Sequence, residues 1–586
     1  MDGVDITIEI CGMSGDGTIA AGGLLNAAMS HAGFSVLAFD SYPAEIRGFG
    51  RCVTTSRIGD EDMLALSDKT NVLISLDDEQ SQSRVPFLVP GAVVLFDNRP
   101  PSYVEEEGAI PAHVEPDVQL YGIPFSDLAT KVSDSKRGRN LVALGAFTSI
   151  FKMLPDDFQG VIEKKFSPKG DKVLEANLQC FQAGYEYGKE TFRDRLQKPL
   201  IPSERGKMQE RVLLSGNEAI AQGAIDAGLK LYFGYPITPA TPIMESLAKS
   251  LPEYGGRVMQ MEDEISSIGA VLGSFHAGQR AMTATSGPGF ALMTEMITHG
   301  VMAEIPAVII DAQRAGPATG LPTKTEQSDL HAAVFGGPGD SARIVLAPTN
   351  VTECYTLTLK SFQWAERYQT PVILLTDFFL DNRVENVSPL MAREEDQRNG
   401  NIFPLQDRKE SYRRYELTEN GISPRAIPGM EGFMFVATGL EHTEVGLPDY
   451  SPKIHMDMSE KRHRKIFSAL QDLPTPEDLY GEGPLDVGVI AWGSTFGSAL
   501  EAVKKGRKKG YKVGVLKVVS LYPFHEGPIR SFMKRCRQIL IPELNYEGQL
   551  ANLIGHLNGK DVVRLNRVTG VPMSASLILE KIEDVL

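Results

Sequence analysis

The stretch that decides the fold is ITIEICGMSGDGTIAAGGLLNAAMSHAGFSVLAFD, residues 6–40. It begins with an apolar run rich in isoleucine at 6–10, turns through glycines at 11–17, and continues with small and apolar residues at 18–32. A second apolar run, residues 34–40, is typical of a strand. This order of strand, glycine-rich turn, helix and strand predicts a βαβ unit that opens a parallel α/β domain.

Similar alternation of strand-like and helix-like runs begins again at Arg211 and at Leu485. Residues 187–208 are mostly charged or polar and have no apolar period, so we predict a linker there. The segment 386–484 is irregular and rich in Pro, Arg and Glu, which indicates a connecting segment with one helix. Its basic run KRHRK, residues 461–465, is interpreted as a solvated helix face rather than a binding patch.

Composition limits the kinds of protein this can be. A chain of 586 residues is too long for one hydrophobic core, which predicts roughly three or four domains. The net charge of −16 argues against a nucleic-acid-binding body, because phosphate contacts need a basic surface. No apolar run approaches the roughly 18 residues of a membrane helix, and the N-terminus lacks the features of a secretory signal. We therefore expect a cytoplasmic protein with small-molecule and protein partners.

The five cysteines are far apart in the sequence. They form no C-x-x-C pair and have no histidine cluster at zinc-like spacing, so we expect this chain alone to hold no iron–sulfur cluster. Scattered cysteines in a large chain are typical of a reducing compartment, which predicts buried free thiols. The residues are Cys11, Cys52, Cys180, Cys354 and Cys536.

The glycine turn of the first domain allows two interpretations. Gly12, Gly15 and Gly17 follow the pattern G-x-x-G-x-G instead of the G-x-G-x-x-G of dinucleotide-binding folds, which argues against NAD. Exposed N–H groups at a helix start attract phosphate, so the turn is either a phosphate or coenzyme A site or a tight turn that needs glycine. Asp16 resembles the start of a metal–diphosphate motif, but residues 38–49 contain no partner Asn. We therefore expect no metal ligand in this chain.

The second α/β stretch holds the more specific signals. Residues 235–239 read YPITP, and the two prolines hold Thr238 in a rigid, extended turn. Residues 261–265, MEDEI, precede a helix of small residues, where a glutamate could be a capping residue. Residues 283–289, TATSGPG, predict a glycine- and hydroxyl-rich loop. Residues 313–330 contain QRAGPATGLPT and QSDL and predict a long ordered loop, which usually carries function.

Taken together, these motifs resemble a known family. YPITP, EDEI, TSGPG, QRAGPATGLPT and QSDL, in this order, are similar to the pyrimidine-binding domain of 2-oxoacid:ferredoxin oxidoreductase α subunits. The first domain resembles the family's γ domain at 12–17, 45–48 and 139–140. The last domain resembles the family's C-terminal domain at 542–550, so the resemblance covers nearly the whole chain.

The resemblance implies three α/β domains: a γ-type domain, a pyrimidine-binding domain for thiamine diphosphate, and a transketolase C-terminal-like domain. Two departures weaken local parts of it, because the turn SYPAE at 41–45 lacks an expected glycine and Ala318 replaces a serine common in the QRAGP loop. The expected boundaries are 1–185, 186–210 (linker), 211–385, 386–484 (connecting segment) and 485–586.

The family's chemistry implies roles for individual residues. A glutamate beside the aminopyrimidine promotes deprotonation of the thiazolium, and we assign Glu264 to this role, with Glu262 as the alternative. Arg314 is expected to bind the carboxylate of the substrate and Thr238 to donate its hydroxyl. The residues expected to contact the thiamine pyrimidine are Tyr235, Ile237 and Glu264. Coenzyme A, as co-substrate, is expected at Gly12, Ser14, Gly15 and Arg47.

The resemblance also implies that this chain holds only part of the enzyme. Since the chain lacks cluster cysteines and a metal–diphosphate motif, we expect Mg²⁺, the diphosphate and a [4Fe–4S] cluster on a β-type partner subunit. The active site is then expected at the interface, with ferredoxin as electron acceptor and an (αβ)₂ assembly. Either direction, oxidative release or reductive fixation of CO₂, is compatible with the sequence.

Fusion of a γ domain to the α portion resembles the type that takes 2-oxoglutarate, while pyruvate and branched-chain oxoacids stay open. A second substrate carboxylate needs another cation, from Lys324, Arg47 or the partner.

Three alternative functions are weaker. An indolepyruvate-type enzyme usually carries its cluster cysteines on the same chain as these motifs, and their absence here counts against it. A scaffold with a decayed thiamine fold conflicts with the joint presence of Thr238, Glu264 and Arg314. An NAD-dependent dehydrogenase rests only on the mis-spaced glycine turn.

Overall fold

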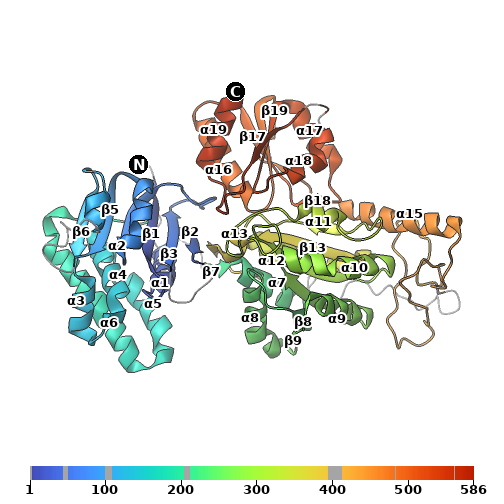
Figure 1. The fold of residues 1–586 in the computed structure, drawn as a ribbon, viewed down its shortest axis with the longest axis horizontal. Helices are drawn as coiled ribbons and strands as arrows, with labels where there is room; N and C mark the ends of the chain where they lie inside the picture. The colour runs from blue at the N-terminus through green and yellow to red at the C-terminus, as the bar shows by residue number, and fades with distance from the viewer. Residues whose placement is uncertain are drawn as a thin grey trace. The chain divides into compact units, whose positions relative to one another are not determined.

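The protein is described from a computed structural model, which describes residues 3–43, 50–98, 109–203, 211–392, 412–481, 483–557, 559 and 561–586. The chain divides into two compact units. The first comprises Met1–Leu214 with Arg383–Pro389, and the second comprises Ser215–Asn382 with Leu390–Leu586. Both are built from β-sheets with packed helices, which confirms the α/β class (Figure 1).

The first unit is built on an eight-stranded sheet with the strand order β6-β5-β4-β1-β3-β2-β14-β7. Its strands are β1 (Asp5–Met13), β2 (Ser35–Ser41), β3 (Arg51–Gly59), β4 (Thr70–Ser75), β5 (Leu88–Asp97), β6 (Gln119–Ile123), β7 (Val212–Ser215) and β14 (Val384–Val387). Its helices are α1 (Thr18–Ala32), α2 (Asp78–Ser81), α3 (Phe125–Ser133), α4 (Arg139–Ile150), α5 (Asp156–Phe166) and α6 (Asp171–Thr191).

The sheet of the first unit is mixed, whereas the sequence predicts a parallel domain. β1, α1 and β2 form the predicted strand–helix–strand sequence, and α1 has the predicted bounds. However, β3 lies between β1 and β2 and is antiparallel to both. The prediction missed this strand because residues 51–59, RCVTTSRIG, have four polar side chains in a row and give no long apolar run.

Helices α4 and α6 pack closely at two glycines. A Cβ atom on Gly145 would collide with the backbone carbonyl of Phe181, and one on Gly184 would collide with that of Val142. These glycines therefore allow the two backbones to approach. Helix α6 continues to Thr191, past residue 185, where the sequence analysis ends the first domain.

Strand β14 returns to the first unit from a distant part of the chain. Val384 pairs with Ala38 of β2 in antiparallel register. The side chain of Asn386 accepts a hydrogen bond from the Val36 amide at 2.8 Å and donates one to the Phe34 carbonyl at 2.7 Å. A segment at the predicted boundary between residues 211–385 and the connecting segment 386–484 thus belongs to the first sheet.

The second unit contains a seven-stranded sheet with the order β18-β12-β13-β11-β10-β8-β9. Its strands are β8 (Leu231–Gly234), β9 (Arg257–Gln260), β10 (Ala281–Thr285), β11 (Ala307–Gln313), β12 (Ile344–Leu346), β13 (Pro371–Asp377) and β18 (Ser520–Tyr522). All neighbours are parallel except β18, which is antiparallel to β12. The helices that belong with it are α7 (Gly216–Asp226), α8 (Thr241–Ser250), α9 (Glu264–His276), α10 (Gly287–Met302), α11 (Leu330–Phe335), α12 (Val351–Tyr368) and α13 (Phe378–Asn382).

The loop predicted at residues 283–289 is instead the end of a strand and the start of a helix. Thr283 and Thr285 are buried in β10, and α10 begins at Gly287. Pro288 lies in the first turn of α10, where backbone N–H groups have no intrahelical acceptor, so a proline costs no hydrogen bond. The proline and glycines that suggested a loop therefore mark a helix start.

The C-terminal part of the second unit has its own five-stranded sheet, ordered β15-β17-β16-β19-β20. Its strands are β15 (Glu477–Asp478), β16 (Leu485–Ala491), β17 (Val513–Lys517), β19 (Cys536–Glu543) and β20 (Val563–Asn566). The helices are α16 (Thr495–Lys508), α17 (Glu526–Arg535), α18 (Gln549–Ile554) and α19 (Ala575–Val585). We call residues 485–586 the C-terminal domain.

The connecting segment contains the predicted helix, α15 (Pro452–Ser468), but its basic run is not a solvated face. Lys461 and Lys465 are 0% and 2% exposed, and their ammonium groups contact the two carboxylate oxygens of Glu304 at 2.5 and 2.6 Å. Burial would raise the pKa of Glu304, but the two lysines and Arg414 outweigh it and lower that pKa. The prediction was wrong because residues four apart share one helix face, and here that face meets a buried carboxylate.

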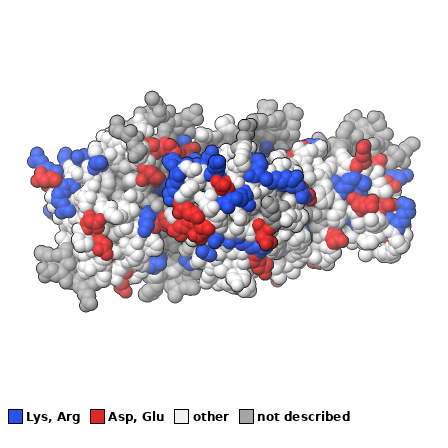
Figure 2. All heavy atoms as spheres, turned by 90° about the horizontal axis from the view of Figure 1, so that it is seen from above, with Lys and Arg blue, Asp and Glu red and all other residues white. Residues whose placement is uncertain are grey.

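Three general features of the chain can be compared with the expectations from composition: surface charge, membrane-spanning helices and cysteines. On the face shown in Figure 2, groups of Lys and Arg lie beside groups of Asp and Glu. Among the described residues no helix is both long and apolar enough to cross a membrane. All five cysteines are buried free thiols, as predicted.

We predict that Glu304→Gln destabilises the second unit by about 3–5 kcal/mol, because it leaves Lys461 and Lys465 buried without a counter-charge. Thermal unfolding measured by circular dichroism checks this. Glu295→Gln, an exposed change on α10, the helix that ends two residues before Glu304, is the matched control and should leave the unfolding temperature unchanged. Equal unfolding temperatures for the two variants would show that the buried cluster contributes nothing.

Candidate active site

The candidate site lies where five parallel strands of the second unit end. β13, β11, β10, β8 and β9 are neighbours in this order, and all run in the same direction. Their carboxyl ends therefore share one edge of the sheet, which is where ligands bind in open α/β folds. Thr238 follows β8, Glu264 follows β9 and Arg314 follows β11. Topology alone brings these three sequence-predicted residues to the same edge.

Arg314 and Thr238 are in direct contact. The Nη1 atom of Arg314 donates a hydrogen bond to the backbone carbonyl of Thr238 at 2.9 Å. The arginine is 7% exposed, and its Nε atom is buried without a hydrogen-bond partner in the described part of the chain. Burial lowers the pKa of Arg314, and the nearby Asp329 acts in the opposite direction. The guanidinium is thus fixed by one bond and keeps donors for an anionic ligand.

The structure distinguishes the two candidate glutamates. Glu264 is the first residue of α9 and is 5% exposed, whereas Glu262 is exposed. Neither caps the helix, because Asp263 is the N-cap and accepts a hydrogen bond from the Ser266 amide at 2.8 Å. Hydrogen bonds from Ser266 lower the pKa of Asp263. Burial therefore favours Glu264 as the residue that faces a ligand.

The carboxylate of Glu264 lies against the start of α10. A Cβ atom on Gly289 would collide with Glu264 Oε1 and with Thr285 Oγ1. Gly289 is therefore required so that the carboxylate can occupy this position. Within the described ranges no group donates a hydrogen bond to the side-chain carboxylate of Glu264. A buried acceptor without a donor is suited to a ligand N–H.

Tyr235 and Ile237 belong to the same turn after β8. The carbonyl of Ile237 accepts hydrogen bonds from the amide and hydroxyl of Thr241, at 3.0 and 3.1 Å, which hold the turn against α8. Tyr235 is 44% exposed. Both residues are near Thr238 in the chain, but their contact with a ligand stays a prediction.

Gln313 is a residue that the sequence analysis missed. Its side chain is 1% exposed, donates to the Thr376 carbonyl at 2.8 Å and accepts from the Asp329 amide at 3.0 Å. The side chain thus closes the base of the loop that begins at Arg314. The QRAGP motif contains Gln313, but only the fold reveals that Asp329 returns to it.

Three carboxylates, also missed, are gathered at this edge of the sheet. Burial raises the pKa of Asp311 well above its ordinary value, and the neighbouring Asp329 and Asp381 raise it further. Burial also raises the pKa of Asp381. The pKa of Asp329 is raised to about 6 by burial and by Glu326, against the effect of Arg314. Asp311 is 0% exposed, and neither carboxylate oxygen has a partner among the described residues.

The glycine turn of the first unit is stabilised by contacts of its own residues. Asp16 accepts a hydrogen bond from the Met13 amide at 2.9 Å and pairs with Arg139. A Cβ atom on Gly12 would lie 2.8 Å from Thr18 Oγ1, so this position needs glycine for packing. Nothing lies within 4 Å of a Cβ placed on Gly15. Of the other residues expected with this turn, Ser14 donates its amide to the Gly50 carbonyl, and Arg47 lies outside the described residues.

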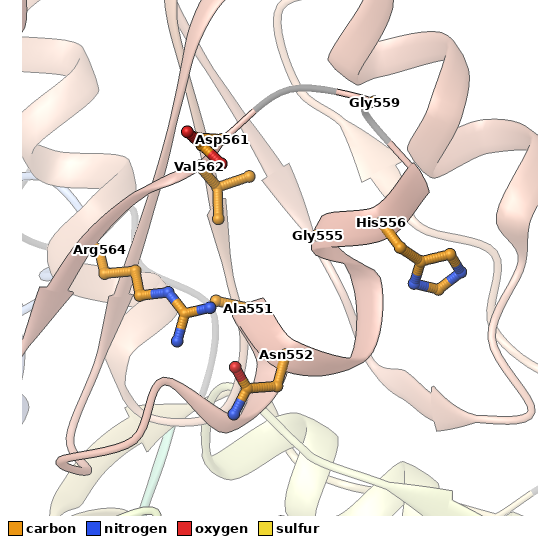
Figure 3. A pocket seen from close by; sticks show the side chains of 8 residues that line it. All are labelled: Ala551, Asn552, Gly555, His556, Gly559, Asp561, Val562 and Arg564. Carbon is orange, nitrogen blue, oxygen red and sulfur yellow. The ribbon is translucent and has the colours of Figure 1, made fainter.

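A hollow of about 650 Å³ lies away from these residues, in the C-terminal domain. In Figure 3 the Arg564 side chain points toward Ala551 and Asn552, while the His556 ring points away from them. Arg564 donates to the Glu547 carbonyl at 2.8 Å, so the arginine supports the local fold. The hollow is lined by Ala551, Asn552, Gly555, His556, Gly559, Asp561, Val562 and Arg564, none of which is a predicted site residue.

Three parts of the chain match described protein families. Residues 7–187 match "Pyruvate ferredoxin/flavodoxin oxidoreductase". Residues 222–461 match "Pyruvate flavodoxin/ferredoxin oxidoreductase, thiamine diP-bdg". Residues 486–576 match "Pyruvate:ferredoxin oxidoreductase core domain II". The matches follow one another along the chain in this order.

Individual relatives cover almost the whole chain. The α subunit of 2-oxoacid:ferredoxin oxidoreductase 2 from Aeropyrum pernix is 30% identical over 97% of this chain and 96% of that protein. The 2-oxoglutarate oxidoreductase subunit KorA of Mycobacterium tuberculosis is 31% identical over 98% of this chain and 90% of that protein. A solved 2-oxoglutarate:ferredoxin oxidoreductase from Magnetococcus marinus, with 2-oxoglutarate, coenzyme A and succinyl-CoA bound, is 36% identical, covers 99% of both chains and gives a TM-score of 0.92.

We predict that Asp311→Asn stabilises the protein more at pH 7.5 than at pH 4.5. A carboxyl whose pKa is raised on folding binds its proton more tightly in the folded state, so its contribution to stability falls as pH rises through the range between the unfolded and folded pKa values. Each tenfold gain in proton affinity on folding corresponds to about 1.4 kcal/mol. The measurement is the unfolding temperature of variant and parent at both pH values. Asp584→Asn, on the surface of α19, is the control, and an Asp311→Asn effect independent of pH would contradict the account.

Proposed function

Because the chain belongs to the 2-oxoacid:ferredoxin oxidoreductases as an α subunit fused to a γ-type domain, we propose that it binds a 2-oxoacid for CoA-dependent oxidative decarboxylation. The balanced reaction converts a 2-oxoacid and coenzyme A into acyl-CoA, CO₂, one proton and two electrons, which ferredoxin accepts. The observation that carries the proposal is the convergence of Thr238, Glu264 and Arg314 at one sheet edge. The reverse direction, reductive CO₂ fixation, uses the same groups.

Arg314 and Thr238 are proposed to bind the 2-oxoacid head group. A guanidinium recognises a carboxylate with two parallel N–H donors, and Arg314 has donors left after its single bond to the Thr238 carbonyl. The Thr238 hydroxyl makes no hydrogen bond within the described ranges, so it can donate to the keto oxygen. Both groups orient the substrate before reaction.

Thiamine diphosphate fits the site through Glu264. A ring N–H of its aminopyrimidine would satisfy the buried carboxylate that lacks a donor among the described residues. When bound, thiamine diphosphate supplies the nucleophilic carbon that attacks the keto group and holds the electrons released with CO₂. Glu264 holds or moves the proton at the pyrimidine nitrogen. Tyr235 and Ile237 are proposed to contact the same ring from the adjacent turn.

A β-type partner subunit is proposed to complete the site with Mg²⁺, the diphosphate-binding residues and a [4Fe–4S] cluster. The five cysteines of this chain are buried, free and scattered, and the site edge carries exposed apolar side chains that a partner would cover. Beside Glu264, Ile265 is 48% exposed, and Leu292 on α10 is 52% exposed. Assembly as (αβ)₂ in the cytoplasm completes this proposal.

Coenzyme A is proposed to contact the first unit at the start of α1. Helix N-termini attract phosphate, and the N-cap of α1, Gly17, provides no side-chain hydrogen bond to the helix. Gly15 leaves space, and Thr18 Oγ1 is buried without a partner in the described ranges. Ser14, Gly12 and Arg47 belong to the same proposed contact.

2-Oxoglutarate is the proposed substrate. The solved relative from Magnetococcus marinus contains 2-oxoglutarate and succinyl-CoA and covers 99% of this chain. The second carboxylate of this substrate needs a further cation, and Lys324, on the loop that begins at Arg314, has no ion-pair partner in the described part of the chain. Pyruvate and 2-oxoisovalerate are the competing substrates that an assay has to include.

We predict that Glu264→Gln lowers turnover of the assembled enzyme at least about 100-fold, because an amide cannot hold the negative charge that the proton step requires. CoA-dependent reduction of a viologen dye with 2-oxoglutarate measures it. Glu262→Gln, two positions away and exposed, is the matched control and should keep the parental rate. Full activity of Glu264→Gln, or loss only in Glu262→Gln, would overturn the assignment.

A further inference from the structure

Gln327 is bound entirely by the C-terminal domain. It is 0% exposed. Its backbone amide donates to the Leu544 carbonyl at 2.7 Å, and its backbone carbonyl accepts from Asn545 Nδ2 at 2.9 Å. Its side-chain oxygen accepts from Thr495 Oγ1 at 2.7 Å, and its side-chain nitrogen donates to the Trp492 carbonyl at 3.2 Å. Backbone and side chain are thus both held by another domain of the same unit.

We call the hydrogen bonds between Gln327 and the C-terminal domain the Gln327 joint. Neighbouring contacts fit this joint to a glutamine side chain. A Cβ atom on Gly493 would lie 2.5 Å from the side-chain nitrogen of Gln327, so the glycine leaves room for the amide. Gln549 donates to the Ser328 carbonyl at 2.7 Å and accepts from the His331 amide at 3.0 Å. The motif at 542–550 therefore supplies a set of directed hydrogen bonds to residues 327–331.

The same loop is fixed at its other side by the seven-stranded sheet. Gln313, directly before Arg314, is bonded to both Thr376 and the Asp329 amide. Thr325 Oγ1 donates to Asp377 at 3.1 Å at the end of β13. Residues 314–328 thus run between two sets of anchors, one on the sheet and one on the C-terminal domain.

We propose that the C-terminal domain positions the substrate-binding arginine, and that Gln327 is the positioning residue through which it acts. This inference rests on the proposed function, in which Arg314 binds the carboxylate of the 2-oxoacid. None of the residues assigned to substrate or cofactor in this unit belongs to the C-terminal domain. Its contribution to the site is the geometry of the loop.

Directed hydrogen bonds are what this role requires. Apolar packing could join the two domains, but it would allow the loop to shift by fractions of an ångström, whereas a buried amide with all its groups paired has one arrangement. Small displacements of a binding group reduce catalysis strongly, because substrate orientation depends on them. A joint at the base of the Arg314 loop therefore controls substrate binding more than overall stability.

The test removes one bond of this joint in the assembled enzyme. Thr495→Val keeps the side-chain shape but loses the hydroxyl that donates to Gln327, and Thr495→Ser restores the donor. We expect Thr495→Val to raise the KM for 2-oxoglutarate about fivefold, the effect of one net hydrogen bond, with a smaller change in kcat. Hydrogen exchange of residues 314–329 should become faster in Thr495→Val and return to the parental rate in Thr495→Ser.

Two controls separate positioning from stability and from the proposed function. Ser498→Ala removes a buried hydrogen bond on the same helix, to the Met573 carbonyl at 2.6 Å, without contact to Gln327, so it should lower the unfolding temperature but leave KM unchanged. Arg314→Lys tests the substrate role itself. If Arg314→Lys leaves KM unchanged, the proposed function is wrong. If Arg314→Lys raises KM while Thr495→Val changes neither KM nor hydrogen exchange, the positioning role alone is wrong.

Gln327→Met is a second variant that tests the same joint with an apolar side chain of similar length. It keeps packing but loses all three side-chain hydrogen bonds, including the one that the Leu544 amide donates at 3.3 Å, so we expect a larger rise in KM than in Thr495→Val. A folded Gln327→Met enzyme with parental KM for 2-oxoglutarate would contradict the inference.

Discussion

The parallel direction of neighbouring strands is the constraint on which the site depends. Because β13, β11, β10, β8 and β9 run the same way, the segments that follow them all begin at one edge of the sheet. Residues more than 70 positions apart, Thr238 and Arg314, meet there through a single hydrogen bond. The strand order thereby brings together functional groups that no single segment of the chain could place side by side.

Buried charge divides this unit into parts with different physical roles. Glu304 forms ion pairs with both Lys461 and Lys465, and these pairs hold helix α15 of the connecting segment to the part of the second unit that contains the seven-stranded sheet. Asp311 and Arg314, by contrast, keep polar atoms without partners among the described residues. The paired cluster supports the fold, whereas Asp311 and Arg314 lie at the sheet edge where a ligand is proposed to bind.

Local patterns in the sequence predict local structure well here. Helix α1 begins and ends where the apolar pattern predicts, and YPITP, EDEI and QRAGP identify turns that the fold brings to one sheet edge. The return of β14 to the first sheet, the burial of Lys461 and the anchoring of Gln327 by Asn545 were missed. Each joins residues more than 150 positions apart, so no local period or spacing contains it.

The central claim is that this chain holds one half of a shared active site. The most direct measurement is CoA-dependent reduction of a viologen dye by the purified chain, alone and together with its β-type partner, with 2-oxoglutarate, pyruvate and 2-oxoisovalerate. The account predicts activity only for the pair and the highest rate with 2-oxoglutarate. Turnover by the chain alone would contradict it.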